Sequence, residues 1–166
     1  MFRASAYGGN REENYKLVSE QARSLWESSL PLSSNLANMS ALLKHFLEKT
    51  NWVGFYLWDA PREELVLGPF QGLPACTRIL SGKGVCGAAV SERRTQRVAD
   101  VHLFPGHIAC DSASESEIVI PLIRNGAVLG VLDIDAPERN RFDSMDQAGL
   151  ETIAGTIVSL WPDHSG

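Results

Sequence analysis

Three cysteines, at positions 76, 86 and 110, are the side chains of this sequence best suited to chemistry. Cys110 lies in a run of small and polar residues, 105–117, next to the apolar run 118–123. A free cysteine used only for packing behaves as a small hydrophobe and would lie inside such a run. A loop that leads into a strand is instead an accessible place that suits a reactive thiol. We therefore take Cys110 as the candidate reactive residue, whereas Cys86, beside Gly87, best fits a packing role.

A metal site is an alternative use for Cys76, Cys86 and Cys110, together with His102 and His107. The tight Cys-x-x-Cys and His-x-x-x-His pairs that are typical of structural zinc do not occur in the sequence. We therefore expect neither a metal nor another cofactor. His107 is expected to cap its loop rather than to assist Cys110.

Two aspartates, Asp133 and Asp135, interrupt an otherwise apolar strand pattern and share one of its faces. Buried carboxylates are unfavourable unless they are paired or used. One alternative is that this face opens to solvent at the end of the strand. The other is that Glu117, Asp133 and Asp135 converge near Cys110. Crowded carboxylates raise one another's pKa, so one of them would stay protonated near neutral pH and could donate a proton.

The hairpin that carries these acids sets a condition on that convergence. The Asn-Gly pair at 125–126, between two apolar runs, is a strong signal for a two-residue hairpin loop. Regular pairing from such a loop would place Glu117 opposite Ile134, so Glu117 would point away from the two aspartates. Convergence therefore predicts an odd number of loop residues, a β-bulge, or a Glu117 that lies beyond regular pairing.

The elements that position these residues can be read from apolar spacing. Amphipathic helices are expected over 12–27 and from a cap at Ser34 onward, after a loose segment at 1–11. Further elements are strands at 51–59, 64–70, 77–80, 96–99, 116–124 and 127–135, a short helix at 85–93, and a final helix capped by Asp143. These elements predict one α+β domain over 1–166, an antiparallel sheet of about six strands. Its N- and C-terminal helices would pack on one face and leave the other open.

Composition excludes several classes of protein. The chain has 166 residues, 44% of them hydrophobic, and a net charge of -5, which is ordinary for one globular domain and unlike a nucleic-acid-binding surface. No apolar run approaches the roughly 20 residues that a membrane span needs. The N-terminus has no apolar core of a signal peptide. With an odd number of cysteines, these features predict a cytoplasmic protein whose thiols act as reagents, with no nucleic-acid or membrane partner.

Six motifs together resemble a known family, the GAF-domain free methionine-(R)-sulfoxide reductases. The resemblance covers most of the chain from about Tyr15 onward, and its most specific part is the three cysteines with the Leu-Asp-Ile-Asp-Ala-Pro motif. The motifs are Asn51-Trp-Val-Gly-Phe-Tyr-Leu57, Gly68-Pro-Phe-Gln-Gly72, Gly82-Lys-Gly-Val-Cys-Gly87, Phe104-Pro-Gly-His-Ile-Ala-Cys-Asp111, Ser116-Glu-Ile-Val-Ile-Pro121 and Leu132-Asp-Ile-Asp-Ala-Pro137.

The resemblance implies a GAF-like fold and the reduction of free methionine-(R)-sulfoxide to methionine, a role in oxidative stress. It implies that Cys110 is the nucleophile, Cys76 the usual resolving partner, and Cys86 an auxiliary or alternative one. It also suggests thioredoxin as reductant and a homodimer. Two alternatives stay open: a sensory GAF module that binds a small ligand without turnover, and a redox sensor whose Cys76–Cys110 bridge reports oxidation.

Under this hypothesis the acids acquire roles, with one of them protonating the sulfoxide oxygen and an anion among them binding the substrate ammonium. Trp52 and Tyr56 share a strand face and would wall a pocket for the methylsulfinyl end, although both also fit an ordinary core. The substrate carboxylate would be bound by backbone N–H groups of the Cys110 loop or by a cation, with Arg78, Lys83 and Arg97 as candidates. Nearby anions should raise the pKa of the Cys110 thiol above about 8.5, so we expect either activation when substrate binds or an acid-assisted attack, rather than a standing thiolate.

Overall fold

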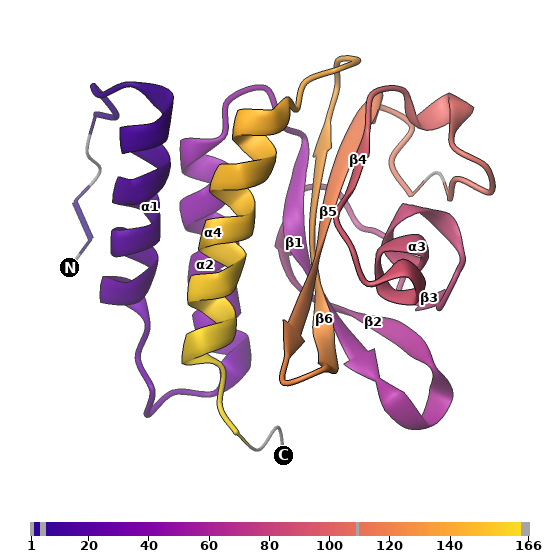
Figure 1. Cartoon of the computed structure of the whole chain (residues 1–166), viewed down its shortest axis with the longest axis horizontal. Coiled ribbons are helices and arrows are strands. Elements are labelled where there is room, and N and C mark those ends of the chain that lie inside the picture. Colours follow the sequence, from indigo (N-terminus) through magenta and orange to yellow (C-terminus); the bar gives the residue numbers. More distant parts are fainter. Residues whose placement is uncertain (1, 4–5, 109, 164–166) are drawn as a thin grey trace.

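The computed structural model describes residues 2–3, 6–108 and 110–163. A six-stranded antiparallel sheet, in the order β3-β2-β1-β6-β5-β4, stands between a layer of three helices and a layer made of loops and one short helix (Figure 1). The elements are α1 (Arg11–Leu25), α2 (Leu32–Phe46), β1 (Trp52–Asp59), β2 (Glu64–Gln71), β3 (Arg78–Leu80), α3 (Gly84–Glu92), β4 (Gln96–Val98), β5 (Ser116–Arg124), β6 (Ala127–Ala136) and α4 (Ser144–Leu160), with 3-10 turns at Ala60–Arg62 and Val101–Leu103. The predicted six-stranded α+β architecture is confirmed.

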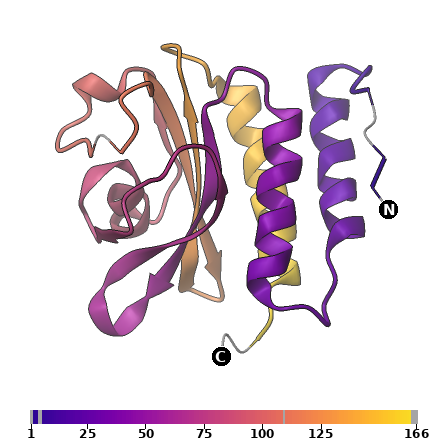
Figure 2. The ribbon, with the colours of Figure 1, turned by 180° about the vertical axis from the view of Figure 1, so that it is seen from behind.

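The helical layer covers one face of the sheet. Helices α2 and α4 pack directly on the strands, and α1 lies outside them (Figures 1 and 2). The interior of this layer is the larger apolar core, to which Leu36, Phe55 and Leu150 contribute completely buried side chains. The predicted cap of the last helix is confirmed, because the Asp143 side chain accepts the N–H groups of Met145 and Asp146.

Two predicted boundaries near the N-terminus are wrong. Residues 10–11 do not belong to a loose segment, because Asn10 caps α1 in a capping box with Glu13 and Arg11 forms an ion pair with Asp143. Helix α2 begins at Leu32 rather than after a cap at Ser34. The reason is Pro31, whose fixed φ is compatible with a helix start and which thereby moves the start three residues earlier.

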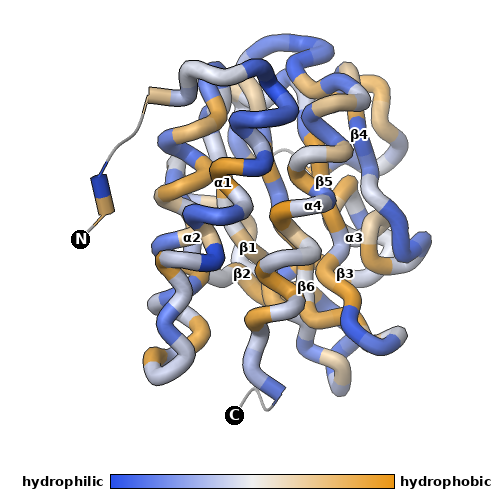
Figure 3. Tube along the Cα trace, turned by 60° about the vertical axis from the view of Figure 1, so that its left-hand side comes forward, coloured by the Kyte–Doolittle hydropathy of each residue, from blue (hydrophilic) through white to orange (hydrophobic). Residues whose placement is uncertain are grey.

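The prediction that the second face of the sheet is open is also wrong. A second apolar cluster covers that face; it includes Trp52, Tyr56 and Leu65 from the strands and Val85 and Ala89 from α3. Helix α3 is apolar on all sides and buried from Gly84 to Val90, as a helix without a polar face must be. In Figure 3 apolar residues recur along the central strands, whereas the edge strand β4 is mostly polar.

Strand β1 supplies side chains to both layers. Val53 and Phe55 enter the core under the helices, whereas Trp52 and Tyr56 enter the cluster on the other face, as the alternating pattern predicts. Its partner β6 lacks a side chain at Gly130, where a Cβ would clash with the Tyr56 carbonyl oxygen. No helix in the described part of the chain has the length and apolar character to span a bilayer.

Candidate active site

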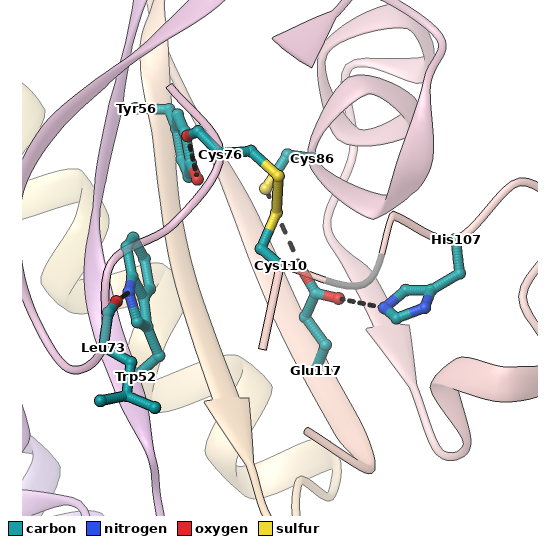
Figure 4. The surroundings of a disulfide bond; sticks show 8 residues. All are labelled: Trp52, Tyr56, Leu73, Cys76, Cys86, His107, Cys110 and Glu117. Carbon is teal, nitrogen blue, oxygen red and sulfur yellow. Dashed lines mark hydrogen bonds and ion pairs between the residues drawn. A yellow bond between two sulfur atoms is a disulfide. The ribbon is translucent and has the colours of Figure 1, made fainter. Parts of the chain in front are cut away.

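A disulfide joins Cys76 to Cys110 across two loops on the α3 side of the sheet (Figure 4). Cys76 lies between β2 and β3, and Cys110 lies in the long connection before β5; their Cα atoms are 5.7 Å apart. The Tyr56 hydroxyl donates a hydrogen bond of 3.0 Å to the Cys76 carbonyl oxygen and so ties the first loop to β1. Two of the three cysteines are therefore within bonding reach, although 34 positions separate them in sequence.

A small cavity lies beside this disulfide. Its volume is ≈ 30 Å³, which is room for a water molecule rather than for an amino acid. Trp52 and Tyr56 line it with stacked rings, their centroids 5.8 Å apart. Its lining also includes Cys86 from α3, residues 107, 108, 110, 111 and 114 of the long loop, and the acids Glu117, Asp133 and Asp135.

The three acids lie together because the β5–β6 ladder contains a bulge. The register shifts between Leu122 and Ile123, and beyond the shift Glu117 pairs with Asp135 rather than with Ile134. Directly paired residues share a face, so Glu117, Asp133 and Asp135 all point toward the cavity. The predicted shift of the hairpin is confirmed, and its form is a bulge after an unchanged two-residue turn at 125–126.

Burial disfavours the charged forms of these three carboxyl groups. Desolvation raises the pKa of Glu117 well above its ordinary value, and the neighbouring Asp133 and Asp135 raise it further. Desolvation also raises the pKa of Asp133 to about 6, although polar contacts with Glu117 and Cys86 act in the opposite direction. The pKa of Asp135 is raised by burial and then by the charges of Asp133 and Asp111. The group therefore keeps protons near neutral pH.

One oxygen of the cluster has no hydrogen-bond partner. Asp133 Oδ1 is buried and unpaired among the described residues. Such a buried polar atom is uncommon in a folded protein and calls for an explanation. Its position in the cavity wall suits a cationic hydrogen-bond donor entering the cavity.

Cys86 is a buried free thiol on α3 whose Sγ lies 4.0 Å from Glu117 Oε1 (Figure 4). Burial raises its pKa well above the ordinary value, and the charges of Asp133 and Glu117 raise it further. It is therefore a thiol rather than a thiolate at neutral pH. Since Cys110 is bonded to Cys76, the expected thiol pKa of Cys110 is not tested by this state of the protein and stays a prediction.

Of the three basic residues considered as ligands for a substrate carboxylate, one lies at the cavity and two lie elsewhere. Lys83 lines the cavity. Arg78 forms an ion pair with Glu64, and Arg97 is an exposed residue of β4 that does not line the cavity. His107 also lines the cavity, with Nε2 3.9 Å from Glu117 Oε2 (Figure 4), and the expectation that it does not assist Cys110 stays a prediction.

Two polar residues at this site escaped the sequence-based reasoning. Ser114 lines the cavity, and Asn51 holds it through a hydrogen bond of 3.0 Å from Nδ2 to Ser114 Oγ. Both are small polar residues: the sequence-based prediction includes Asn51 only as the first residue of the strand 51–59, and Ser114 only as one of the small residues in the 105–117 run. For Asn51 the available hint was that it opens a motif of the family resemblance, Asn51–Leu57.

The cysteine–histidine zinc set considered from sequence does not exist as such, because Cys76 and Cys110 bond to each other. Among the described residues, Cys86, Glu117 and Asp133 place possible ligand atoms within 4.8 Å of one another, and so do Asp100, His102 and Glu115. Arg139 already pairs with Asp100 and Glu115 in the second group. The expectation that no metal is needed stays a prediction.

The antiparallel sheet, with helices on one face and a loop-covered cavity on the other, defines a GAF domain. The GAF domain family model matches residues 38–160. A free methionine-R-sulfoxide reductase of Escherichia coli is 46% identical over 151 residues, covering 91% of this chain and 90% of that protein.

Two solved structures of proteins with this name are similar to the chain. The fRMsr of Staphylococcus aureus in complex with substrate shares 56% identity and a TM-score of 0.82, over 89% of this chain and 95% of that one. The free methionine-R-sulfoxide reductase of Neisseria meningitidis in complex with its substrate shares 42% identity and a TM-score of 0.88, over 96% and 94%. The chain belongs to the GAF-domain free methionine-R-sulfoxide reductase family.

Proposed function

We propose that this protein reduces free methionine-(R)-sulfoxide to methionine with its own thiols. The observation that carries the proposal is a disulfide, Cys76–Cys110, beside a cavity walled by three buried carboxyl groups. A disulfide is the state that remains after a thiol has taken oxygen from a substrate and a second thiol has condensed with it. The names of the relatives in E. coli and N. meningitidis support the substrate and its epimer.

The reaction uses two thiols in sequence. Cys110 Sγ attacks the sulfoxide sulfur, the sulfur–oxygen bond breaks, and the oxygen passes with a proton to Cys110 as a sulfenic acid while methionine leaves. Cys76 Sγ then attacks that sulfur and releases water, which forms the disulfide. A dithiol protein returns both cysteines to thiols through a mixed disulfide.

The carboxyl cluster has two tasks in this scheme. One protonated member of Glu117, Asp133 and Asp135 supplies the proton for the departing oxygen, because their raised pKa values keep a proton in the cluster near pH 7. The unpaired Asp133 Oδ1 accepts a hydrogen bond from the substrate ammonium. Trp52 and Tyr56 contact the methylsulfinyl end.

The loop that carries Cys110 explains a preference for the free amino acid. In the disulfide state the cavity, at ≈ 30 Å³, is too small for methionine sulfoxide, so the substrate enters after reduction, when the two loops can separate. Substrate enclosed beneath the loop of residues 100–116 would leave no path for a peptide chain on either side. The substrate ammonium and carboxylate must both be free.

Cys86 serves the cluster in this scheme rather than the disulfide exchange. Its buried thiol, with a raised pKa, is a poor nucleophile but can donate a hydrogen bond to Glu117. The alternative, that Cys86 resolves Cys110 when Cys76 is absent, is separated by the Cys76→Ser experiment in the Discussion.

The finer features of the proposal are thioredoxin as the reductant, a homodimer as the working form, and a cytoplasmic location with a role in oxidative stress. Thioredoxin is tested by NADPH consumption in the presence of thioredoxin and its reductase. Dimerisation is tested by light scattering on the eluting protein. No cofactor is needed, because the electrons come from thiols.

One assay tests the activity. Purified protein with dithiothreitol or thioredoxin is given each epimer of methionine sulfoxide, free or within a peptide, and the methionine formed is measured. We expect turnover of the free R epimer alone, loss of turnover in Cys110→Ser, and normal turnover in Ser112→Ala, an exposed position in the same loop. Turnover that survives Cys110→Ser would refute the assigned nucleophile. A wild-type protein that cycles its disulfide without consuming sulfoxide would be a redox sensor instead.

A further inference from the structure

Asn51, directly before β1, connects the loop of Cys110 to the strand of Asp135. Its backbone N–H donates a hydrogen bond of 3.0 Å to the Asp135 carbonyl oxygen. Its side-chain Nδ2 donates to Asp111 Oδ2 at 2.9 Å and to Ser114 Oγ at 3.0 Å. One residue therefore holds both ends of the turn that follows Cys110 and fixes that turn to the sheet.

The turn from Asp111 to Ser114 is closed by its own bonds. Asp111 Oδ1 accepts the N–H of Ala113 at 2.8 Å, and the Ser114 N–H donates to the Asp111 carbonyl oxygen at 3.2 Å. An aspartate that bonds the backbone two residues ahead is typical of a tight turn. Since the other Asp111 oxygen and the Ser114 hydroxyl both accept from Asn51 Nδ2, the turn is closed by its own bonds and is held from outside by the residue directly before β1.

The amide orientation at position 51 is determined by these partners. The Asp111 carboxylate can only accept, so an N–H group must face it. This leaves Asn51 Oδ1 buried without a partner among the described residues. An unpaired buried acceptor is unfavourable, so the two bonds of Nδ2 outweigh that loss.

The attachment becomes important once the disulfide is reduced. In the oxidised protein Cys110 is held covalently by Cys76 and by a bond of 3.1 Å from its N–H to the Ile108 carbonyl oxygen. Reduction removes the covalent tie. The Cys110 segment then stays attached to the sheet through the turn bonded to Asn51 and, beyond the turn, through Glu115, whose N–H donates a hydrogen bond of 2.8 Å to the Ala136 carbonyl oxygen of β6. Of these attachments, the bonds to Asn51 are the ones that hold the turn itself, directly after Cys110.

We propose that Asn51 is a positioning residue that keeps Cys110 near Cys76 and over the carboxyl cluster in the dithiol protein. Its role in turnover rests on the proposed function. Its effect on the thiol–disulfide equilibrium does not, because that equilibrium exchanges two electrons and two protons between the cysteine pair and dithiothreitol, without sulfoxide.

The test is the equilibrium constant for disulfide formation against dithiothreitol, measured by mass spectrometry after alkylation of free thiols. Asn51→Asp keeps the size of the side chain but sets a carboxylate against Asp111. It should lower the constant about tenfold, as expected from the loss of one hydrogen bond to a charged group; this corresponds to a shift of about 30 mV toward a more oxidising disulfide. The double variant Asn51→Asp/Asp111→Asn exchanges donor and acceptor and should restore the constant to within about threefold.

Asn38→Asp, an exposed position on α2, is the matched control and should leave the constant unchanged. If Asn51→Asp does not fold, Asn51→Ala, which removes the donor without adding charge, gives the same comparison. An unchanged constant in the Asn51 variant that folds, or no recovery in the double variant, would overturn the inference. A lowered constant in a protein that does not consume sulfoxide would uphold the inference while refuting the proposed function.

Discussion

Replacing Asp133 by asparagine should stabilise the protein while it abolishes turnover. The residue is 6% exposed, and burial raises the pKa of its carboxyl group from 3.8 to about 6. That difference corresponds to about 3 kcal/mol by which folding disfavours the charged form. Since the asparagine side chain carries no charge, Asp133→Asn should raise the free energy of unfolding by about 2–3 kcal/mol at pH 8, near the upper limit that this pKa difference allows.

The stability difference between Asp133→Asn and wild type should depend on pH in a definite direction. The pKa of Asp133 is higher in the folded than in the unfolded protein, so the folded state holds the proton more tightly. Its contribution to stability is therefore fully present below about pH 4 and is lost as the pH rises through about 6. The difference between Asp133→Asn and wild type should be small near pH 4 and should grow to its full size by about pH 8.

Urea denaturation of the disulfide form at several pH values measures this difference, because the cross-link then stays constant. Asp163→Asn is the matched control, since that side chain is 90% exposed and its loss should change stability little. A variant that is less stable than wild type at pH 8, or whose advantage does not depend on pH, would refute the reasoning that burial of this charge is unfavourable.

Three further predictions concern the cysteines, the sheet and the cavity. Cys76→Ser, treated with one equivalent of sulfoxide, should form a sulfenic acid at Cys110 that dimedone traps, whereas a disulfide to the remaining buried cysteine in its mass spectrum would show that this thiol resolves. Gly130→Ala should destabilise the protein by about 1–3 kcal/mol, because its Cβ meets the Tyr56 carbonyl oxygen, while Gly155→Ala, in open space on α4, should stabilise it by about 0.5–1 kcal/mol; thermal unfolding decides both. The disulfide form should bind methionine sulfoxide at least tenfold more weakly than the dithiol form, because its cavity of ≈ 30 Å³ is too small; comparable affinities in calorimetry would contradict this.

Local sequence patterns predicted the strands that carry the site better than they predicted how the loops cover it. The Asn-Gly turn, together with the need for the acids to converge, predicted an irregular β5–β6 register, and the ladder contains a bulge beyond Leu122. The alternation of β1 correctly assigned Trp52 to the cavity side. Both are properties of strands with a fixed period of two, so they can be read from neighbouring residues.

What sequence could not give was the approach of loops to the sheet. His107 reaches Glu117, and Asn51 reaches Asp111, through contacts with a loop that no strand or helix period predicts. The error about the open face had a different origin, because the signal was present: residues 84–90 contain no polar side chain except the Cys86 thiol, and such a helix requires cover.

The two faces of the sheet explain how the molecule tolerates its carboxyl cluster. Three buried acids with raised pKa values are a local loss of stability, and they lie on the face that is covered by loops and the short helix α3. The opposite face carries the larger apolar core, closed by α2 and α4, which keeps β1, β5 and β6 in place irrespective of the charge of the cluster. Because each strand alternates between the faces, the residues that stabilise the sheet and those that line the cavity are neighbours in sequence. The acids can thus be both poorly solvated and firmly placed, which is the condition that a proton donor for an enclosed sulfoxide requires.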